Sequence, residues 1–216
     1  ATAPKIWDRL RDKYHRDLFT IEDIRANKDL LNPDSAKYLN HYDAVRRRIH
    51  RDEIFVFEIV LKYFIRLRFG KTSKIVIAGS YRRGRETSGD IDVLVGDPNY
   101  SLKELVDYLT RKNVIVEVLS LGEMKAHCIA HCPGNFLHPF RMDIQYAPDP
   151  ASWASMLLYF SSGVHVNRWM RLEASKKGFK LSEYGLSKGS KKLHTPDERR
   201  IFEILDIPYI PVEQRD

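Results

Sequence analysis

The alternation of apolar and polar positions divides the chain into regions of different type. Residues 1–50 follow a helical spacing without strand-like alternation, and their last helix is expected to end in the basic cluster at 46–49. Between residues 52 and 69, apolar side chains recur every three or four positions and Gly70 follows. This pattern predicts an amphipathic helix that ends at the glycine and packs on a sheet.

The centre of the chain has the pattern of a sheet. Short runs of β-branched and aromatic residues are bounded by turn residues, as is typical of strands. The predicted strands span 74–79, 91–96, 114–120, 124–132 and 140–146. A helix is predicted at 102–111, between the second and third strands. This order indicates a mixed α/β unit.

After a proline-rich stretch at 147–150, the pattern is helical again at 153–160 and 164–177. A mixed tail with a short helix at 196–205 follows. We therefore expect an α+β (mixed) fold with three parts, which are a helical part at 1–50, an α/β centre at 51–149 and a mixed C-terminal part at 150–216.

The composition is that of a folded and basic protein. Of 216 residues, 43% are hydrophobic, which suffices for a core, and the formal net charge is +7. That charge suits a polyanionic partner but does not require one. No apolar stretch approaches the ~20 residues of a membrane span, and the charged first residues do not resemble a signal peptide. Two cysteines give no disulfide framework, so an intracellular location is predicted.

The segment from Gly79 to Asp92 carries the strongest chemical signal. A predicted strand leads into a basic turn rich in glycine, and the next strand opens with Asp90 and Asp92. Because residues i and i+2 of a strand share a face, both carboxylates are expected to project into the mouth of that turn. Carboxylates suit Mg²⁺, whereas glycine backbone, Ser80 and Arg83 suit phosphate. The pattern predicts a site for a metal-bound triphosphate.

A third carboxylate, Asp143, lies in the predicted strand 140–146, which can pair beside the strand of Asp92. Two Mg²⁺ ions ~4 Å apart on three carboxylates can activate a hydroxyl and neutralise a leaving pyrophosphate. The three aspartates together predict nucleotidyl transfer. Taken singly, each is also a common surface residue of a strand.

The string GSYRRGRETSGDIDVLVG resembles the nucleotidyltransferase signature of the family X DNA polymerases. Upstream, LFTIEDIRANKDLLNPDSAKYLNHYDAVRRRIHRDEI is similar to the family's duplex-binding helices. Downstream, FRMDI, LLYFSSGVHVNRWMRLEASKKGFKLSEYGL and YIPVEQRD resemble its third-aspartate strand, its nucleotide-binding segment and its usual C-terminus. The resemblance implies a nucleotidyltransferase palm with a mixed sheet at 51–149, a duplex-DNA-binding subdomain before it, and a nascent-base-pair-binding subdomain after it.

The resemblance also implies roles for single residues. Asp90, Asp92 and Asp143 are implied as ligands of two Mg²⁺ ions, for which Mn²⁺ can substitute, with Arg141 beside the third aspartate. The residues implied in nucleotide binding are Arg48, Gly79, Ser80, Arg83, Gly89, Tyr159, Phe160, Gly163 and Asn167. Those implied in DNA binding are Arg46, Arg47, Arg171, Lys176 and Lys177.

The implied activity is that of a template-directed DNA polymerase that fills short gaps in base excision repair, using dNTPs. Its partners are gapped or primed DNA and dNTP, it is expected to be a monomer, and it acts in the nucleus or, if viral, in the cytoplasm of an infected cell. Two alternatives stay open. One is a template-independent nucleotidyltransferase acting on single-stranded ends or a small acceptor, and the other is a non-catalytic DNA-binding scaffold, which the three retained carboxylates disfavour.

Several positions depart from the family's pattern. Nothing here resembles the family's lyase domain, so lyase activity is not expected. The usual Gly-x-Gly-Pro of a duplex-binding hairpin reads Ala-Thr-Ala-Pro at 1–4, Gly163 is shifted by one position, and Val164 replaces a position that is often acidic. Gln145 stands where an arginine is thought to link the open and closed states. We therefore expect DNA gripping and closure to differ from the family's usual form.

A zinc site formed by His127, Cys128, His131 and Cys132 is rejected. In a strand the two histidines fall on one face and the two cysteines on the other, so the four cannot surround one ion.

Overall fold

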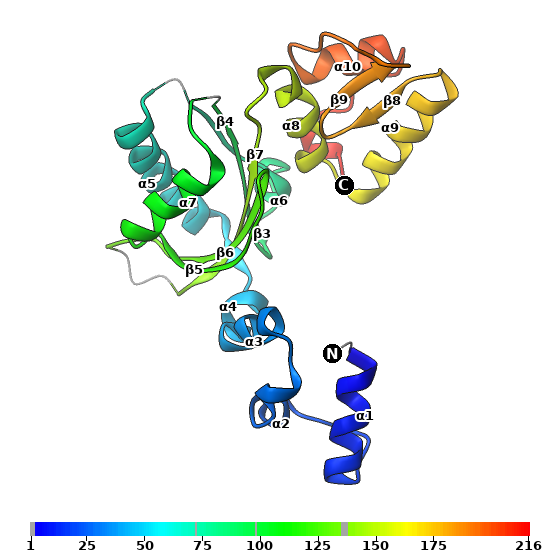
Figure 1. Ribbon diagram of the computed structural model, residues 1–216. Coiled ribbons are helices and arrows are strands. Elements are labelled where there is room, and N and C mark those ends of the chain that lie inside the picture. Colours follow the sequence, from blue (N-terminus) through cyan, green and yellow to red (C-terminus); the bar gives the residue numbers. More distant parts are fainter. Residues whose placement is uncertain (1–2, 72, 98, 135–137) are drawn as a thin grey trace.

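The computed structural model describes residues 3–71, 73–97, 99–134 and 138–216. Figure 1 shows a chain of small helices at the N-terminal end, a sheet with helices on one side, and a smaller C-terminal group of helices and strands. Of the duplex-binding hairpin expected at 1–4, residues 1 and 2 lie outside the described residues, and a helix begins at the third position.

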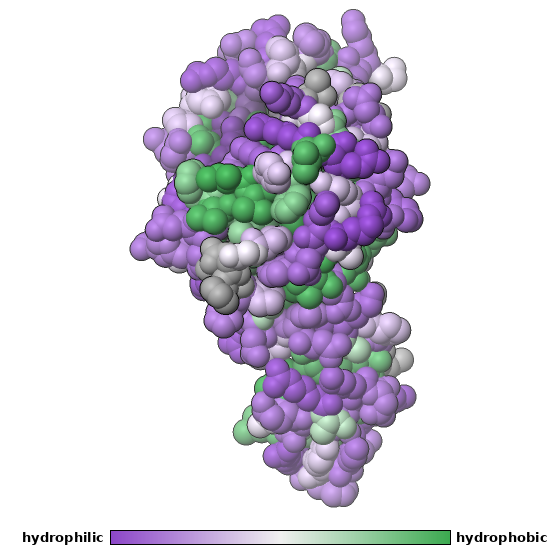
Figure 2. All heavy atoms as spheres, turned by 90° about the vertical axis from the view of Figure 1, so that its left-hand side faces the viewer, coloured by the Kyte–Doolittle hydropathy of each residue, from purple (hydrophilic) through white to green (hydrophobic). Residues whose placement is uncertain are grey.

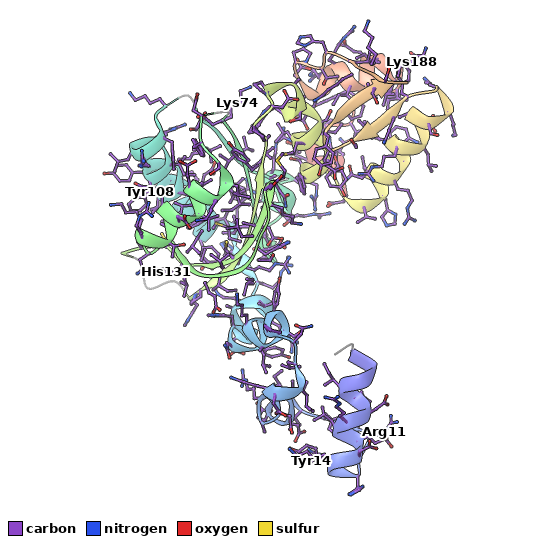
Figure 3. All side chains as sticks on the ribbon, in the orientation of Figure 1. Arg11, Tyr14, Lys74, Tyr108, His131 and Lys188 are labelled. Atoms are coloured by element: carbon purple, nitrogen blue, oxygen red, sulfur yellow. The ribbon has the colours of Figure 1, made fainter. Side chains whose placement is uncertain are left out.

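The N-terminal part is a series of short helices. They are α1 (Ala3–Tyr14), α2 (Ile21–Arg25), a 3₁₀ turn (Lys28–Leu30), α3 (Pro33–Asn40) and α4 (Tyr42–Arg46). Tyr14, labelled on α1 in Figure 3, accepts a hydrogen bond of 2.9 Å from the amide of the buried Asn27. This contact ties α1 to the turn that follows α2.

The helix that was expected to end in the basic cluster at 46–49 ends at the first residue of that cluster. Helix α4 ends at Arg46, and Arg47 adopts an extended conformation. The next residues form β1 (Ile49–His50), which pairs antiparallel with β3 (Thr87–Ser88). This pairing brings the end of the helical part to the glycine-rich turn.

The central sheet has five strands in the order β2-β4-β7-β6-β5. These are β2 (Lys74–Ile77), β4 (Ile91–Gly96), β5 (Ile115–Leu121), β6 (Lys125–Ala130) and β7 (Phe140–Tyr146). Only β4 and β7 run parallel, and the other neighbours are antiparallel. The predicted mixed sheet is confirmed, although β2 ends earlier than expected because Gly79, at φ +57°, opens α6 (Gly79–Arg82).

The two faces of this sheet differ in what covers them. Helices α5 (Arg51–Phe69) and α7 (Leu102–Arg111), both as predicted, cover one face, where Figure 1 shows them side by side. Alternate residues such as Val93 and Met142 enter the core beneath them. The residues between these, Asp92 and Asp143 among them, point to the opposite face.

The C-terminal part has its own core. It comprises a 3₁₀ turn (Pro150–Ser152), α8 (Trp153–Ser161), α9 (Val164–Lys176), β8 (Lys180–Ser182), β9 (Gly185–Lys188), β10 (Lys191–Lys192), α10 (Glu198–Ile204) and a last 3₁₀ turn (Val212–Gln214). Its buried residues include Leu158, Met170 and Phe202. Within the described ranges, no helix combines the length and apolar character needed to cross a membrane.

Candidate active site

Two aspartates stand side by side in the middle of the sheet. The parallel register of β4 and β7 sets Asp92 directly opposite Asp143. Both lie on the face that α5 and α7 leave uncovered, since their neighbours Val93 and Ile144 enter the core. The expectation that the strand of Asp143 pairs beside that of Asp92 is confirmed.

The carboxyl group of Asp92 is difficult to ionise in this position. Burial, followed by the negative charge of Asp143, raises the pKa of Asp92 from 3.8 to about 6, although Lys125 and Arg83 act in the opposite direction. Gly79 packs against the same group, because a methyl group at this position would overlap Asp92 Oδ2. Two crowded carboxylates of like charge form a donor set that suits a divalent cation.

Asp90 is held apart from this pair. It precedes β4, and its Oδ2 accepts a hydrogen bond from Nη2 of Arg141, whose Nε lies 3.8 Å from Asp143 Oδ1. In the part of the chain that the structure describes, no group of three His, Cys, Asp or Glu side chains is arranged to hold a metal ion. Asp90 would have to leave Arg141 before it could join Asp92 and Asp143 as a third ligand.

His127 is a site residue that the sequence analysis did not identify. It lies on β6 opposite Asp143, and its Nδ1 is 2.8 Å from Asp143 Oδ1. Sequence reasoning treated His127 only as a rejected zinc ligand, and Cys128 on the next position is buried in the core as a free thiol. The alternation of polar and apolar residues in β6 and β7 indicates that His127 and Asp143 lie on the polar faces of their strands. That the two residues lie opposite each other depends on the register of the strands.

The turn between β2 and β4 holds several residues expected to bind a triphosphate. Ser80 Oγ donates to Ser88 Oγ over 2.8 Å, and the guanidinium of Arg48 donates to the carbonyl oxygen of Thr87 over 2.7 Å. A Cβ at Gly89 would lie 3.4 Å from a guanidinium nitrogen of Arg48. The structure thus brings Arg48, from the N-terminal part, to the glycine-rich turn.

Arg83 extends from the same turn to the end of the chain. Its Nε donates to Asp216 Oδ1 over 2.7 Å, and Arg85 also pairs with Asp216. Burial lowers the pKa of the Arg83 guanidinium, although the charge of Asp92 acts against this. A phosphate that binds Arg83 would therefore compete with the carboxylate of Asp216.

The residues expected to face the nucleotide and the new base pair meet where α8 joins α9. Both amide hydrogens of Asn167 are donated within this turn, to the carbonyl oxygens of Tyr159 and Ser162, each over 2.9 Å. The guanidinium of Arg171 lies 4.8 Å from the centre of the Tyr159 ring. A pocket of about 390 Å³ is lined by Tyr159, Val164, Asn167, Arg168, Arg171 and Leu172.

Two other residues of that segment are fixed by packing. Phe160 packs against the cluster of Leu94, Ala147 and Met156 on the open face of the sheet. The backbone N–H of Gly163 donates to the carbonyl oxygen of Arg215, and a Cβ at this position would overlap Asp216. Gly163 therefore permits the end of the chain to lie against the α8–α9 turn.

The residues expected to contact DNA phosphates fall into two groups. Arg46 and Lys176 are exposed, with partners on their own helices, Tyr42 and Glu173. Arg47 forms an ion pair with Glu53, and Lys177 donates to the carbonyl oxygens of residues 205 and 206. The first group is available to a polyanion, whereas Arg47 and Lys177 hold parts of the chain together in this structure.

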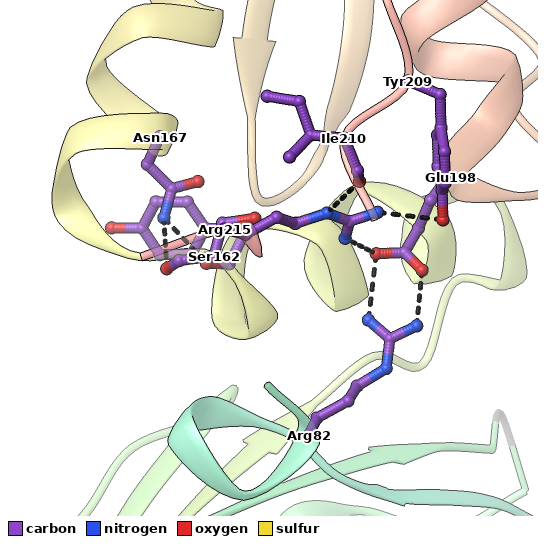
Figure 4. A network of polar contacts seen from close by, with 8 residues as sticks. Arg82, Ser162, Asn167, Glu198, Tyr209, Ile210 and Arg215 are labelled. Atoms are coloured by element: carbon purple, nitrogen blue, oxygen red, sulfur yellow. Dashed lines mark hydrogen bonds and ion pairs between the residues drawn. The ribbon is translucent and has the colours of Figure 1, made fainter. Parts of the chain in front are cut away.

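A polar network that the sequence did not predict joins the α6 turn to the C-terminal part (Figure 4). Arg82 donates to both carboxylate oxygens of Glu198, over 3.0 and 2.6 Å, and Nη1 of the fully buried Arg215 donates to Glu198 Oε1 over 2.5 Å. Although burial raises the pKa of Glu198, the hydrogen bonds and charges of the two arginines lower it overall. No local sequence pattern marks a contact between residues 82 and 198.

Comparisons with known proteins match this chain in two places. The model of the DNA polymerase beta palm matches residues 48–149, and that of the DNA polymerase beta thumb matches residues 156–216. DNA polymerase lambda of Rattus norvegicus is 31% identical over 94% of this chain and 39% of its own length. DNA polymerase lambda of Arabidopsis thaliana is 28% identical over the whole chain and 44% of its own length. DNA polymerase IV of Saccharomyces cerevisiae is 39% identical over 27% of this chain and 10% of its own length. The chain thus spans about two fifths of the two lambda relatives.

Proposed function

The chain belongs to family X of the DNA polymerases, and from this membership we propose that it is a template-directed DNA polymerase that fills short gaps during DNA repair. The observation that carries the proposal is the register of β4 and β7, which sets Asp92 against Asp143 on the open face of the palm. The reaction joins a primer 3′-hydroxyl to the α-phosphate of a dNTP and releases pyrophosphate.

We assign the metal ions to the carboxylates. Asp92 and Asp143 would hold divalent Mg²⁺, and Asp90 would complete the ligand set once it has left Arg141. Two bound Mg²⁺ ions would supply activation of the hydroxyl and neutralise charge on the leaving pyrophosphate. Arg141 would then balance the charge of the crowded carboxylates.

His127 orients the third aspartate. Because its Nδ1 lies against Asp143 Oδ1, the other carboxylate oxygen is the one left for a metal ion or the primer hydroxyl. In the tautomer that carries the proton on Nδ1, His127 donates a hydrogen bond to Asp143 Oδ1 and so fixes the rotation of the carboxylate.

We assign triphosphate binding to the glycine-rich turn. Ser80, Arg83 and Arg48 would contact the phosphate oxygens, and backbone N–H groups near Gly79 and Gly89 would add donors. Arg83 has to exchange the carboxylate of Asp216 for a phosphate. The sugar and base would then lie toward Tyr159 and Asn167.

We propose that the three parts divide the work. The helical part at 1–50 would bind duplex DNA, the palm at 51–149 would carry the chemistry, and the C-terminal part at 150–216 would hold the nascent base pair. Action inside the cell, in the nucleus or in the cytoplasm of an infected cell, agrees with a DNA substrate.

Primer extension on three matched substrates tests the function. A one-nucleotide gap, an open template and a single strand share the same primer, with Mg²⁺ and each dNTP in turn. We expect templated insertion on the first two, and its loss in Asp143→Ala. The matched control is Asp107→Ala, an aspartate on α7 whose ion pair with Lys103 is exposed. Untemplated addition to the single strand would favour the template-independent alternative, and inactivity of the unaltered chain on every substrate would favour the non-catalytic scaffold.

A further inference from the structure

The outer face of α5 carries a row of apolar side chains. Phe55, Ile59, Tyr63 and Leu67 follow one another at intervals of four, and each is between 54% and 62% exposed. Residues four apart lie in one row along a helix. The opposite face already supplies the residues that pack on the sheet, such as Phe57 and Leu61. The row is therefore not needed for the core.

This row is unusual for a surface helix. Single exposed apolar residues are common, but a helix that packs on one face normally presents polar residues on the other. From Phe55 to Leu67 the row extends over ~18 Å at the helical rise. Figure 2, which views the α5 side of the molecule, shows an apolar patch within a mostly polar surface. Contiguous apolar patches of this kind mark contact sites.

A groove runs along this row, and the residues that line it indicate what kind of partner it could bind. The groove has a volume of about 830 Å³ and is lined by Ile59, Lys62, Tyr63, Arg66, Leu67 and Lys71. Three of these residues are basic and none is acidic. Lys62 pairs with Glu58, whereas Arg66 and Lys71 form no ion pair with any residue that the structure describes. An apolar floor with a basic rim fits an apolar ridge with acidic flanks.

Two other occupants fit less well. A second copy of this chain docked through α5 would bring Lys62, Arg66 and Lys71 of both copies together, and like charges repel across an interface. The phosphates of a nucleic acid would pair with the basic groups. Aliphatic side chains such as Ile59 and Leu67 would make no favourable contact with those phosphates.

We propose that the outer face of α5 is a docking surface for an acidic amphipathic helix of another protein. Its apolar residues would enter the groove between Ile59, Tyr63 and Leu67, and its carboxylates would meet Arg66 and Lys71. The surface lies on the helix-covered side of the sheet, away from Asp92, so docking leaves the open face accessible. One helix face buries little area, so the interaction is transient.

A pair of synthetic helical peptides tests this proposal with the full chain. The first has leucine at every third or fourth position and glutamate on both flanks, and its twin has lysine in place of each glutamate. Binding is measured by fluorescence anisotropy of the labelled peptides. We expect the acidic peptide to bind at least roughly tenfold more tightly than its twin, since the flanking charges of the two peptides have opposite sign and only the acidic ones attract the basic rim.

Variants of the chain locate the binding. Ile59→Ser with Leu67→Ser should weaken the acidic peptide roughly tenfold or more. The control Tyr184→Ser alters a residue of similar exposure in the C-terminal part and should leave binding unchanged. Arg66→Glu with Lys71→Glu should reverse the preference between the two peptides. All sites are exposed, and a thermal melt confirms that each variant is folded.

Three results would overturn the proposal. The first is equal binding of both peptides, or no binding of either at millimolar concentration. The second is binding that survives the serine substitutions. The third is sedimentation of the chain as a dimer that Ile59→Ser and Leu67→Ser convert to a monomer, which would make a second copy the occupant. None of these measurements depends on polymerase activity.

Discussion

Replacing Glu198 by glutamine should destabilise the C-terminal part more than any single change to its partners on the palm. Glu198 is almost buried and accepts hydrogen bonds from Arg82 and from the fully buried Arg215. Glu198→Gln keeps the size of the side chain but leaves two facing guanidinium charges without a counter-charge. Breaking a buried pair in this way costs about 3–5 kcal/mol.

Two further variants give the expected ranking. Arg82→Ala leaves Glu198 paired with Arg215, and because Arg82 is partly exposed the loss should be about 1.5–3 kcal/mol. The control Arg200→Ala removes an exposed partner of Glu203, 2.9 Å away, and should change stability by less than about 0.5 kcal/mol.

Urea unfolding measures these differences. Trp153 and Trp169 lie in α8 and α9 and the third tryptophan, Trp7, lies in α1, so in a Trp7→Phe background tryptophan fluorescence reports on the C-terminal part, while far-UV circular dichroism reports on the whole chain. Transitions that do not coincide would show that this part unfolds separately. A Glu198→Gln variant as stable as Arg200→Ala, or more stable than Arg82→Ala, would refute the reasoning.

The same network has a predictable pH dependence. Because the pKa of Glu198 is lower in the folded chain than its ordinary value of 4.5, its contribution is fully present above that value. The contribution is lost as the pH falls through the folded pKa. The stability difference between the unaltered chain and Glu198→Gln should therefore be constant near neutral pH and shrink below pH 4.5. A difference that grows on acidification would contradict the assigned charge state.

Three further outcomes are expected. Gly79→Ala should abolish nucleotide insertion because its methyl group displaces Asp92, whereas Gly84→Ala, also at positive φ but with nothing within 4 Å, should cost only backbone strain; equal insertion rates would contradict this. Asp216→Asn should lower the KM for dNTP severalfold by freeing Arg83, and an unchanged KM would show that the contact is not competitive. The negative slope of log affinity for DNA against log salt should become less steep by about 0.9 in Arg46→Ala, and an unchanged slope would remove Arg46 from the phosphate contacts.

Much of the fold follows from periodicity. Helix α5 and strand β4 match their predicted ranges within one residue, because their apolar residues repeat with the period of the element. The same alternation puts Asp92 and Asp143 on the face opposite to that of Val93 and Ile144, whereas the register of β4 on β7 sets the two aspartates side by side. The strand at 74–79 was predicted too long because its apolar pattern continues to a glycine whose φ of +57° turns the chain.

The contacts that complete the site could not be predicted in this way. His127 reaches Asp143 only through the register of β6 on β7, and Arg82 reaches Glu198 across 116 positions of sequence. Asp90 and Asp92 are two apart, yet Arg141 from another strand holds Asp90 aside. Such pairings depend on tertiary geometry, and one sequence contains no periodic signal for them.

Adjacent arginines of the glycine-rich turn connect it to the C-terminal part in two different ways. Arg82 binds the nearly buried Glu198, whereas Arg83 binds Asp216, whose side chain is 38% exposed. A phosphate could displace the second carboxylate at little cost, because water can solvate an exposed aspartate, but not the first. If dNTP binds at Arg83, it would therefore release Asp216 from that arginine and leave it held to the turn by Arg85 alone, while Arg82 keeps α10 attached. Since the backbone of Gly163 also contacts Arg215 and Asp216, that release would reach the α8–α9 turn, where Tyr159 and Asn167 lie. Nucleotide binding and the position of these residues would then be coupled through Asp216.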